Sequence, residues 1–105
     1  MTASTLTPVF AALGDDTRWA ILARLGEAPA SASALARELP VSRQAIVKHL
    51  EVLRAVGLVE SETQGREVVH RALGGRLNDV ARRLEAIGTA WDARLAGIKR
   101  LAEGD

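Results

Sequence analysis

The chain has 105 residues, of which 48% are hydrophobic, 26% charged and 3% aromatic, and its formal net charge is +1. This length and composition belong to a single globular domain with a modest core. The absence of cysteine excludes disulfides, thiolate catalysis and thiol-based metal or redox sensing. No apolar run is long enough to span a membrane and no signal-peptide pattern is present, so we expect a cytoplasmic protein without membrane association.

Two short helices are predicted at the N-terminus. Gly14 ends the first helix, and either Asp15 or Asp16 can cap the second by accepting hydrogen bonds from its free N–H groups. The apolar stripe of the first helix consists of Leu6, Phe10 and Leu13. The inward face of the second consists of Ile21, Leu22 and Leu25.

A helix-turn-helix is predicted next. Ser31 or Ser33 caps a third, short helix, which Pro40 cannot continue. Ser42 is placed to cap a fourth helix that runs to about Val56, where a glycine follows as a left-handed stop. Two helices joined by a turn of a few residues form the helix-turn-helix arrangement.

The segment from about residue 58 to 73 changes to a strand-like pattern and predicts a β-hairpin, or wing. The dipeptide Gln64-Gly65 is a turn signal between two runs with β-branched residues. Closing the hairpin on these two residues alone would set Glu62 opposite Glu67, which is a like-charge pair. The register therefore stays open, and a longer or bulged loop would relieve this repulsion.

One long helix is predicted from about residue 76 to 103. Its apolar residues recur at intervals of three and four, interrupted only where Arg94 stands, with Leu95 beside the gap. Packed partner helices need a seam of this period. The sequence thus predicts one mainly α-helical domain over residues 1–105 with a small β-hairpin, in which residues 5–75 form the winged core and 76–103 a dimerisation helix.

The fourth helix carries two different faces. Ile46, Leu50 and Leu53 form one apolar ridge that should pack on the preceding helix. Gln44 and Lys48 lie on the opposite side. In a helix-turn-helix, the N-terminal residues of the second helix enter the major groove of DNA.

Residue types on this polar face suit DNA recognition. Gln can bind adenine in bidentate fashion, Arg or Lys can bind guanine, and a valine can contact the thymine methyl group. The free N–H groups of a helix N-terminus can hold a phosphate. The candidate DNA-binding residues are Ser42, Arg43, Gln44, Val47, Lys48 and His49 on the helix, and Gln64 and Arg66 at the hairpin tip.

Each of these assignments has a structural alternative. Gln44 and Lys48 can be ordinary solvated residues, and Val47 can cover the core. His49 is more often a buried, hydrogen-bonded helix residue than a DNA ligand. Glu51, one turn beyond Lys48, opposes phosphate binding unless it pairs with an arginine. The combination of turn, polar face and hairpin carries more weight than any single residue.

Three segments resemble the winged helix-turn-helix repressors of the ArsR/SmtB family: "FAALGDDTRWAILARL", "LARELPVSRQAIVKHLEVLRAVGLV" and "SETQGREVVHRAL". The resemblance covers about residues 6–103. It implies a homodimeric, cytoplasmic repressor that binds double-stranded operator DNA overlapping its own promoter. It also implies that the fourth helix is the recognition helix, the hairpin the wing, and the first and last helices the dimer interface.

The chain departs from the family pattern at several positions. Asp16 stands where Pro is usual, Pro40 where Gly or a polar residue is usual, Trp19 where Arg is common, and Val47 where Ser is common. The family's metal-sensing cysteine pair and its Asp, His and Glu set are missing, so we expect no metal and no cofactor. Relief of repression by a small molecule, by a partner protein or by protein concentration alone stays open.

Pairing of two subunits would place two recognition helices about 34–36 Å apart, one turn of B-DNA. A lone winged helix would bind little better than non-specifically. Trp91 is the best candidate for an anchor at the centre of the interface, with packing inside its own subunit as the alternative. The expected interface residues are Leu6, Phe10, Leu77, Leu84, Ile87, Trp91, Leu95 and Ile98.

A protein-interaction module and an enzyme are the alternatives to a repressor. A winged-helix module that has lost DNA binding and holds a partner protein would agree with the small net charge and with Glu51. An enzyme would need a Ser/His/Asp set, paired carboxylates in a cleft or a phosphate-binding loop, and "ALGGRL" lacks the lysine of such a loop. We therefore expect no enzymatic activity.

Overall fold

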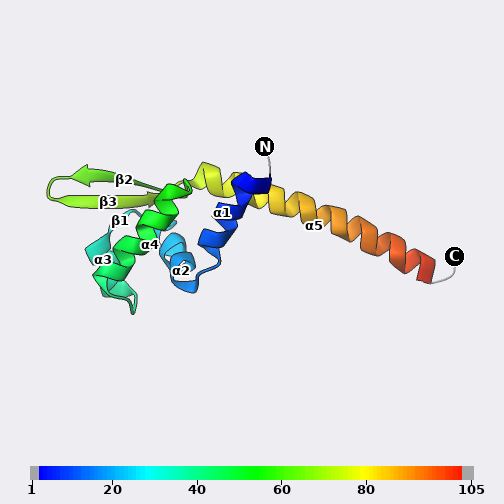
Figure 1. Cartoon of the computed structure of the whole chain (residues 1–105), viewed down its shortest axis with the longest axis horizontal. Coiled ribbons are helices and arrows are strands. Elements are labelled where there is room, and N and C mark those ends of the chain that lie inside the picture. Colours follow the sequence, from blue (N-terminus) through cyan, green and yellow to red (C-terminus); the bar gives the residue numbers. More distant parts are fainter. Residues whose placement is uncertain (1–2, 103–105) are drawn as a thin grey trace.

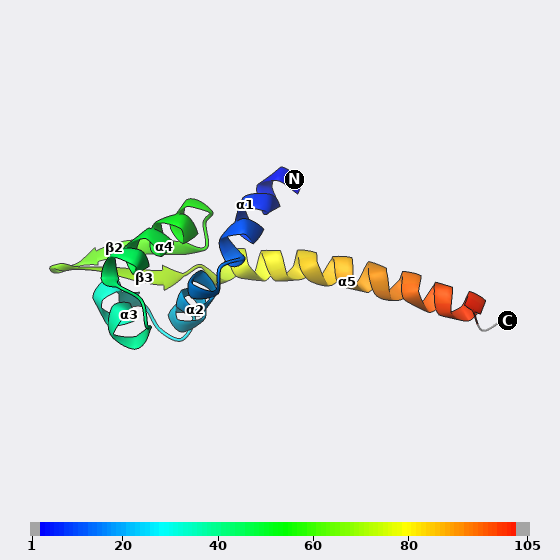
Figure 2. The ribbon, with the colours of Figure 1, turned by 60° about the horizontal axis from the view of Figure 1, so that its bottom comes forward.

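The computed structural model describes residues 3–102, and the side chains of residues 7–90 and 92–102. The elements α1–α4 and the sheet gather in one body, and α5 leaves this body as a single extended helix (Figures 1 and 2). In chain order the elements are α1 (Ala3–Leu13), α2 (Asp16–Leu25), β1 (Ala30–Ser31), α3 (Ala32–Glu38), α4 (Arg43–Ala55), β2 (Val59–Gln64), β3 (Glu67–Ala72) and α5 (Gly74–Ala102).

Side-chain caps fix where three of the helices begin. Asp15, Ser31 and Ser42 precede α2, α3 and α4, and each accepts a hydrogen bond from the backbone N–H three residues on, at 2.9, 3.1 and 3.2 Å. These bonds satisfy N–H groups that have no partner within the helix. Between the alternatives left by the sequence, the structure selects Asp15 over Asp16 and Ser31 over Ser33.

The sheet has three antiparallel strands in the order β1-β3-β2, one more than the predicted hairpin. The additional strand pairs Ala30 with His70 and Ser31 with Val69. Two residues are too few to show the alternating pattern by which a strand is identified in a sequence. Strand β1 holds the start of α3 against β3, and so ties the helix-turn-helix to the wing.

The wing closes one residue later than the turn that the sequence suggested. Gln64 pairs with Glu67, which leaves Gly65 and Arg66 as a two-residue loop, and Glu62 lies opposite a valine. Gly65 has φ +64, as the first loop position of a type II′ hairpin turn requires. A longer or bulged loop is therefore not needed, because the shifted register alone removes the like-charge pair.

The core lies between α1, α2, α3, α4 and the base of the sheet, and α5 enters it only near its own start. Val80 is 3% exposed, and Leu77 is partly buried against the same cluster. The largest fully buried side chains are Val9, Ile21, Leu35, Ile46, Leu53, Leu58 and Val59. The body therefore has an interior of its own that does not depend on the distal two-thirds of α5.

The long helix has about the predicted extent. It begins at Gly74 instead of residue 76, and Glu103 lies outside the described residues. Within residues 3–102, no helix combines the length and apolar character needed to cross a membrane.

Gly57 ends α4 with φ +78, in the left-handed region. We expect Gly57→Ala to lower the free energy of unfolding by about 1–2 kcal/mol, because a Cβ in this region approaches the following carbonyl oxygen. Chemical denaturation measures the change. Gly75→Ala is the matched control: it lies inside α5, and an added Cβ there meets no atom within 4 Å. Equal destabilisation by both substitutions would contradict the backbone explanation.

Candidate nucleic-acid interface

The two faces of α4 are arranged as predicted. Ile46, Leu50 and Leu53 are 0%, 3% and 0% exposed, so the apolar ridge is buried in the core. Gln44 and Lys48 are exposed on the outer side. Burial of the ridge thus leaves the polar N-terminal half of α4 open to a ligand.

The turn between α3 and α4 positions this outer face. The N–H of Val41 donates to the carbonyl of Leu39 at 2.8 Å, and Ser42 then caps α4. Because Ser42 is exposed at the helix N-terminus, its hydroxyl and the neighbouring N–H groups lie where a phosphate can approach.

A cleft of about 330 Å³ lies between α3, α4 and β3, and guanidinium groups from two elements border it. Arg43 of α4 donates from Nε to Oγ of Ser33 at 3.0 Å, which holds its side chain toward α3. Arg66 borders the cleft from the wing, and Val47, 36% exposed, lines it from α4. Glu67 is the acidic residue among the lining groups. Helix α4 and the wing thus share one partly cationic recess.

The tip of the wing is exposed. Gln64 and Arg66 are both exposed, and the Nε2 group of Gln64 donates to Oε1 of Glu62 at 3.1 Å. The Gln64 side chain is therefore turned along its own strand in the free protein, and it would have to rotate to reach DNA.

His49 lies between α4 and the start of α2. Its Nδ1 is 3.5 Å from Nη1 of Arg18 and 3.9 Å from Oδ2 of Asp15. Arg18 also donates from Nε to the carbonyl of Ala12 at 2.7 Å, and its backbone N–H lowers the pKa of Asp15. This geometry favours the structural alternative for His49, and a phosphate contact stays a prediction for Nε2 alone.

A second polar cluster, which the sequence did not single out, lies beneath the wing. Nδ1 of His70 is 2.7 Å from Oγ of Ser61, to which Nη1 of Arg54 donates at 3.5 Å. His70 is only 8% exposed, and burial, followed by the nearby charge of Arg54, lowers its pKa. Residues two apart on a strand lie on the same face of the sheet, so His70 points inward together with Ala72. This alternation in the sequence could have identified His70 as a buried residue.

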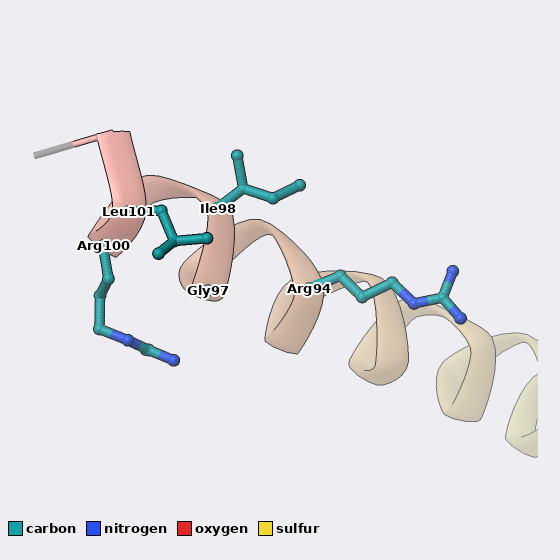
Figure 3. A pocket seen from close by; sticks show the side chains of 5 residues that line it. All are labelled: Arg94, Gly97, Ile98, Arg100 and Leu101. Carbon is teal, nitrogen blue, oxygen red and sulfur yellow. The ribbon is translucent and has the colours of Figure 1, made fainter.

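Most of the predicted interface residues lie along one uncovered surface. Phe10 is 37% exposed, and Leu84, Ile87, Leu95 and Ile98 are 50%, 53%, 56% and 60% exposed. Towards its C-terminal end, α5 presents Ile98 and neighbouring side chains with no second element beside them (Figure 3).

The remaining predicted interface residues differ from this group. Leu77 packs on the core of its own subunit. The side chains of Leu6 and Trp91 lie outside the described residues. Trp19 of α2, to which the sequence gave no role, is 60% exposed.

Among the side chains that the structure describes, no three His, Asp or Glu residues are grouped so that they could hold a metal ion.

Comparison with protein families and curated proteins gives two matches. A family model described as a helix-turn-helix domain matches residues 13–62. The HTH-type transcriptional regulator Rv2034 of Mycobacterium tuberculosis is 38% identical over 96 residues, which cover 90% of this chain and 87% of that protein.

Solved structures with the same architecture include two that bear on the site. The ArsR-like transcriptional regulator from Rhodococcus sp. RHA1 has a TM-score of 0.83 and 61% identity, and the match covers 97% of this chain and 96% of that chain. The homodimeric winged helix-turn-helix DNA-binding domain of Mb0332 from Mycobacterium bovis has a TM-score of 0.66 and 26% identity, and the match covers 85% of this chain and 80% of that chain.

The buried His70 makes the stability of the fold dependent on pH. Its folded-state pKa lies below the ordinary value of 6.5, so between these two values the unfolded chain binds more protons than the folded one. We therefore expect the free energy of unfolding to fall as the pH is lowered through 6.5 toward the folded-state pKa. Urea unfolding over this range measures the loss. His70→Gln should abolish this pH dependence of the free energy of unfolding, and His49→Gln, the matched control, should retain it. Loss of the dependence in His49→Gln but not in His70→Gln would show that it does not come from His70.

Proposed function

The chain belongs to the ArsR family of winged helix-turn-helix transcriptional regulators, and we propose that it is a homodimeric, sequence-specific repressor without a metal site, which controls its own operator. The observation that carries this proposal is the exposed polar face of α4. Gln44 and Lys48 stand opposite a fully buried ridge, so they are free to enter a major groove without any rearrangement of the core.

The proposed contacts divide into base recognition and backbone binding. Gln44 is suited to adenine and Lys48 to guanine, and Val47 is suited to a thymine methyl group. Arg43 and Arg66 border the recess between α4 and the wing, where a phosphate of the adjoining backbone would meet both guanidinium groups. Phosphate contacts of this kind fix the register of the protein on DNA, and base contacts supply specificity.

The proposed DNA recognition also involves a second subunit. Mb0332, which shares the fold, is a homodimer, and we extend this assembly to the present chain. The exposed apolar residues of α1 and α5 support the extension, because a contiguous apolar surface of this kind on a small domain marks an interaction site. A dimer would present two α4 helices to successive major grooves about 34–36 Å apart.

Alanine substitution at Gln44 or Lys48 tests the proposed readout. We expect each to weaken binding to the DNA upstream of the gene by about 10-fold or more, since a bidentate base contact is worth about 1–3 kcal/mol and the dimer loses two. Gel-shift titration at fixed salt measures this. Arg82→Ala, on an exposed side chain of α5, is the control and should leave the affinity unchanged.

Two outcomes would contradict the readout. Unchanged affinity in both variants would remove α4 as the reading element. Absence of any specific shift by the unaltered dimer would favour a protein-interaction module without DNA binding. The salt dependence adds a distinction: loss of a phosphate contact by Lys48→Ala lowers the slope of log K against log salt, whereas loss of a base contact leaves it nearly unchanged.

Trp91 tests the proposed dimer. Its side chain lies outside the described residues, and its place at the middle of the α5 seam comes from the sequence alone. We expect Trp91→Ala to shift the protein toward monomer in sedimentation velocity, because truncation of a buried aromatic at an interface centre commonly costs about 2 kcal/mol or more. Asp92→Ala, next to it, should leave the dimer intact. A dimer unaffected by Trp91→Ala would refute the anchor.

A further inference from the structure

His70 is the middle residue of a row of three that crosses the sheet beside α4. The strand register places Ser61 of β2 level with it on one side and Ala30 of β1 level with it on the other. Nδ1 of His70 is 2.7 Å from Oγ of Ser61, so this nitrogen is turned toward β2. The opposite edge of the imidazole, which carries Nε2, is therefore turned toward β1, where the alanine side chain has no polar group to bind it.

This Nε2 edge faces the cleft of about 330 Å³ between α3, α4 and β3. His70 lines the cleft together with Arg43 and Arg66. Ser31 and Ser33 line it from the β1 side of the ring. The imidazole is only 8% exposed, and within the described residues Nε2 makes no hydrogen bond. A ligand in the cleft therefore meets a nitrogen that has no competing partner in the protein.

Charged side chains from α4 and the wing surround His70. The two clefts that it lines also contain three arginines and two glutamates: Arg43, Arg54 and Arg66, and Glu51 and Glu67. Among the described side chains, α2 and α3 add no charged group to these linings, and Arg71 with its carboxylate partners lies on the other face of the sheet. The surroundings therefore carry a small excess of positive charge, which disfavours a protonated His70 until an anion enters.

Burial keeps His70 neutral in the free protein. Removal of the imidazole from water, followed by the nearby charge of Arg54, lowers the pKa of His70 below its ordinary value of 6.5. A phosphate beside the ring acts in the opposite direction, because a nearby negative charge favours the protonated imidazole. Proton binding to His70 and anion binding in the cleft are therefore linked, and each strengthens the other.

We propose that His70 binds a phosphate of the DNA backbone through Nε2, in the same recess as Arg43 and Arg66, and takes up one proton from solvent when it does so. The proposal rests on the DNA binding proposed above, to which it adds a phosphate ligand and a dependence of affinity on pH. The Nε2–H group of a protonated imidazole donates a charge-assisted hydrogen bond to a phosphate oxygen, which is stronger than a bond from neutral imidazole. Nδ1 keeps its contact with Ser61, whose hydroxyl oxygen has two lone pairs and can accept from both His70 and Arg54.

The dependence of DNA affinity on pH tests this proposal. We expect binding to the DNA upstream of the gene to strengthen as the pH falls through the DNA-bound pKa of His70 toward its lower free-state pKa. The gain is up to about 10-fold per pH unit for each His70 that takes up a proton. Fluorescence anisotropy at constant salt measures the affinity, over the pH range in which circular dichroism shows the protein to be folded.

Two variants assign this pH dependence. His70→Gln should lose it, since a glutamine amide can still bind Ser61 but takes up no proton in this range. His49 is present in the unaltered protein and in His70→Gln, so its own contribution cancels in the comparison. Arg82→Ala, on an exposed side chain of α5, should keep the dependence of the unaltered protein. An equal slope of log affinity against pH in His70→Gln and the unaltered protein would overturn the proposal.

A direct measurement on the unaltered protein does not depend on the folding of any variant. The chain has two histidines, so in isotope-labelled protein two imidazole Cε1–H signals report on them, and His49→Gln assigns the signals. We expect the pKa of His70 in an NMR titration to rise when the upstream duplex is added, and no rise would overturn the proposal. Inorganic phosphate is the second probe. A rise with inorganic phosphate and none with the duplex would overturn the DNA backbone as the ligand.

These results separate the phosphate contact from the repressor itself. Sequence-specific binding in which His70 keeps its pKa would leave the repressor standing and remove His70 from the interface with DNA. A rise in the pKa of His70 with duplexes of any sequence, without preference for the upstream DNA, would support the phosphate site and contradict sequence-specific repression.

Discussion

Burial of one ridge on α4 determines which face of this helix is exposed, and the proposed contacts with DNA depend on that face. Ile46, Leu50 and Leu53 each bury a side chain worth about 1.5–3 kcal/mol, so together they contribute an amount comparable to the net stability of a small domain. Rotation of α4 that hid Gln44 and Lys48 would expose this ridge at a similar cost. The core therefore keeps the polar face outward, and the proposed binding to DNA needs no prior rearrangement of the helix.

The sequence predicted most reliably what short-range rules decide. The cap at Ser42, the buried ridge and the long final helix all follow from residue types a few positions apart, whereas the caps at Asp15 and Ser31 were each one of two alternatives. Strand β1 was missed because two residues carry no period. The wing register depends on which residue takes a positive φ, and Gly65 could serve as either the first or the second loop position. Pairing between the two strands decides which loop position Gly65 takes, and the residues of the turn alone do not reveal it.

Features made by segments far apart in the chain were not predictable in the same way. The Ser61, His70 and Arg54 cluster joins both wing strands to α4. An apolar groove that includes Trp19 in its lining takes its walls from α1, α2 and α5. An isolated stretch of helix is marginal in water, so the exposed distal part of α5 depends on packing for most of its stability. The sequence shows the apolar seam of α5 but does not show what packs against it.

A net charge of +1 is compatible with a DNA-binding surface because the charges are unevenly distributed. Several carboxylates are paired with arginines away from α4: Glu38 with Arg24, Glu60 and Glu62 with Arg71, and Asp79 with Arg82 and Arg83. Arg43, Lys48 and Arg66 stay exposed on α4 and the wing, where Glu51 and Glu67 are exposed as well. So few cations release few counterions, and non-specific affinity should be weak at moderate salt. In the proposed homodimer, discrimination of an operator would then come from base contacts made twice, so coupling of the two subunits would matter more than overall basicity.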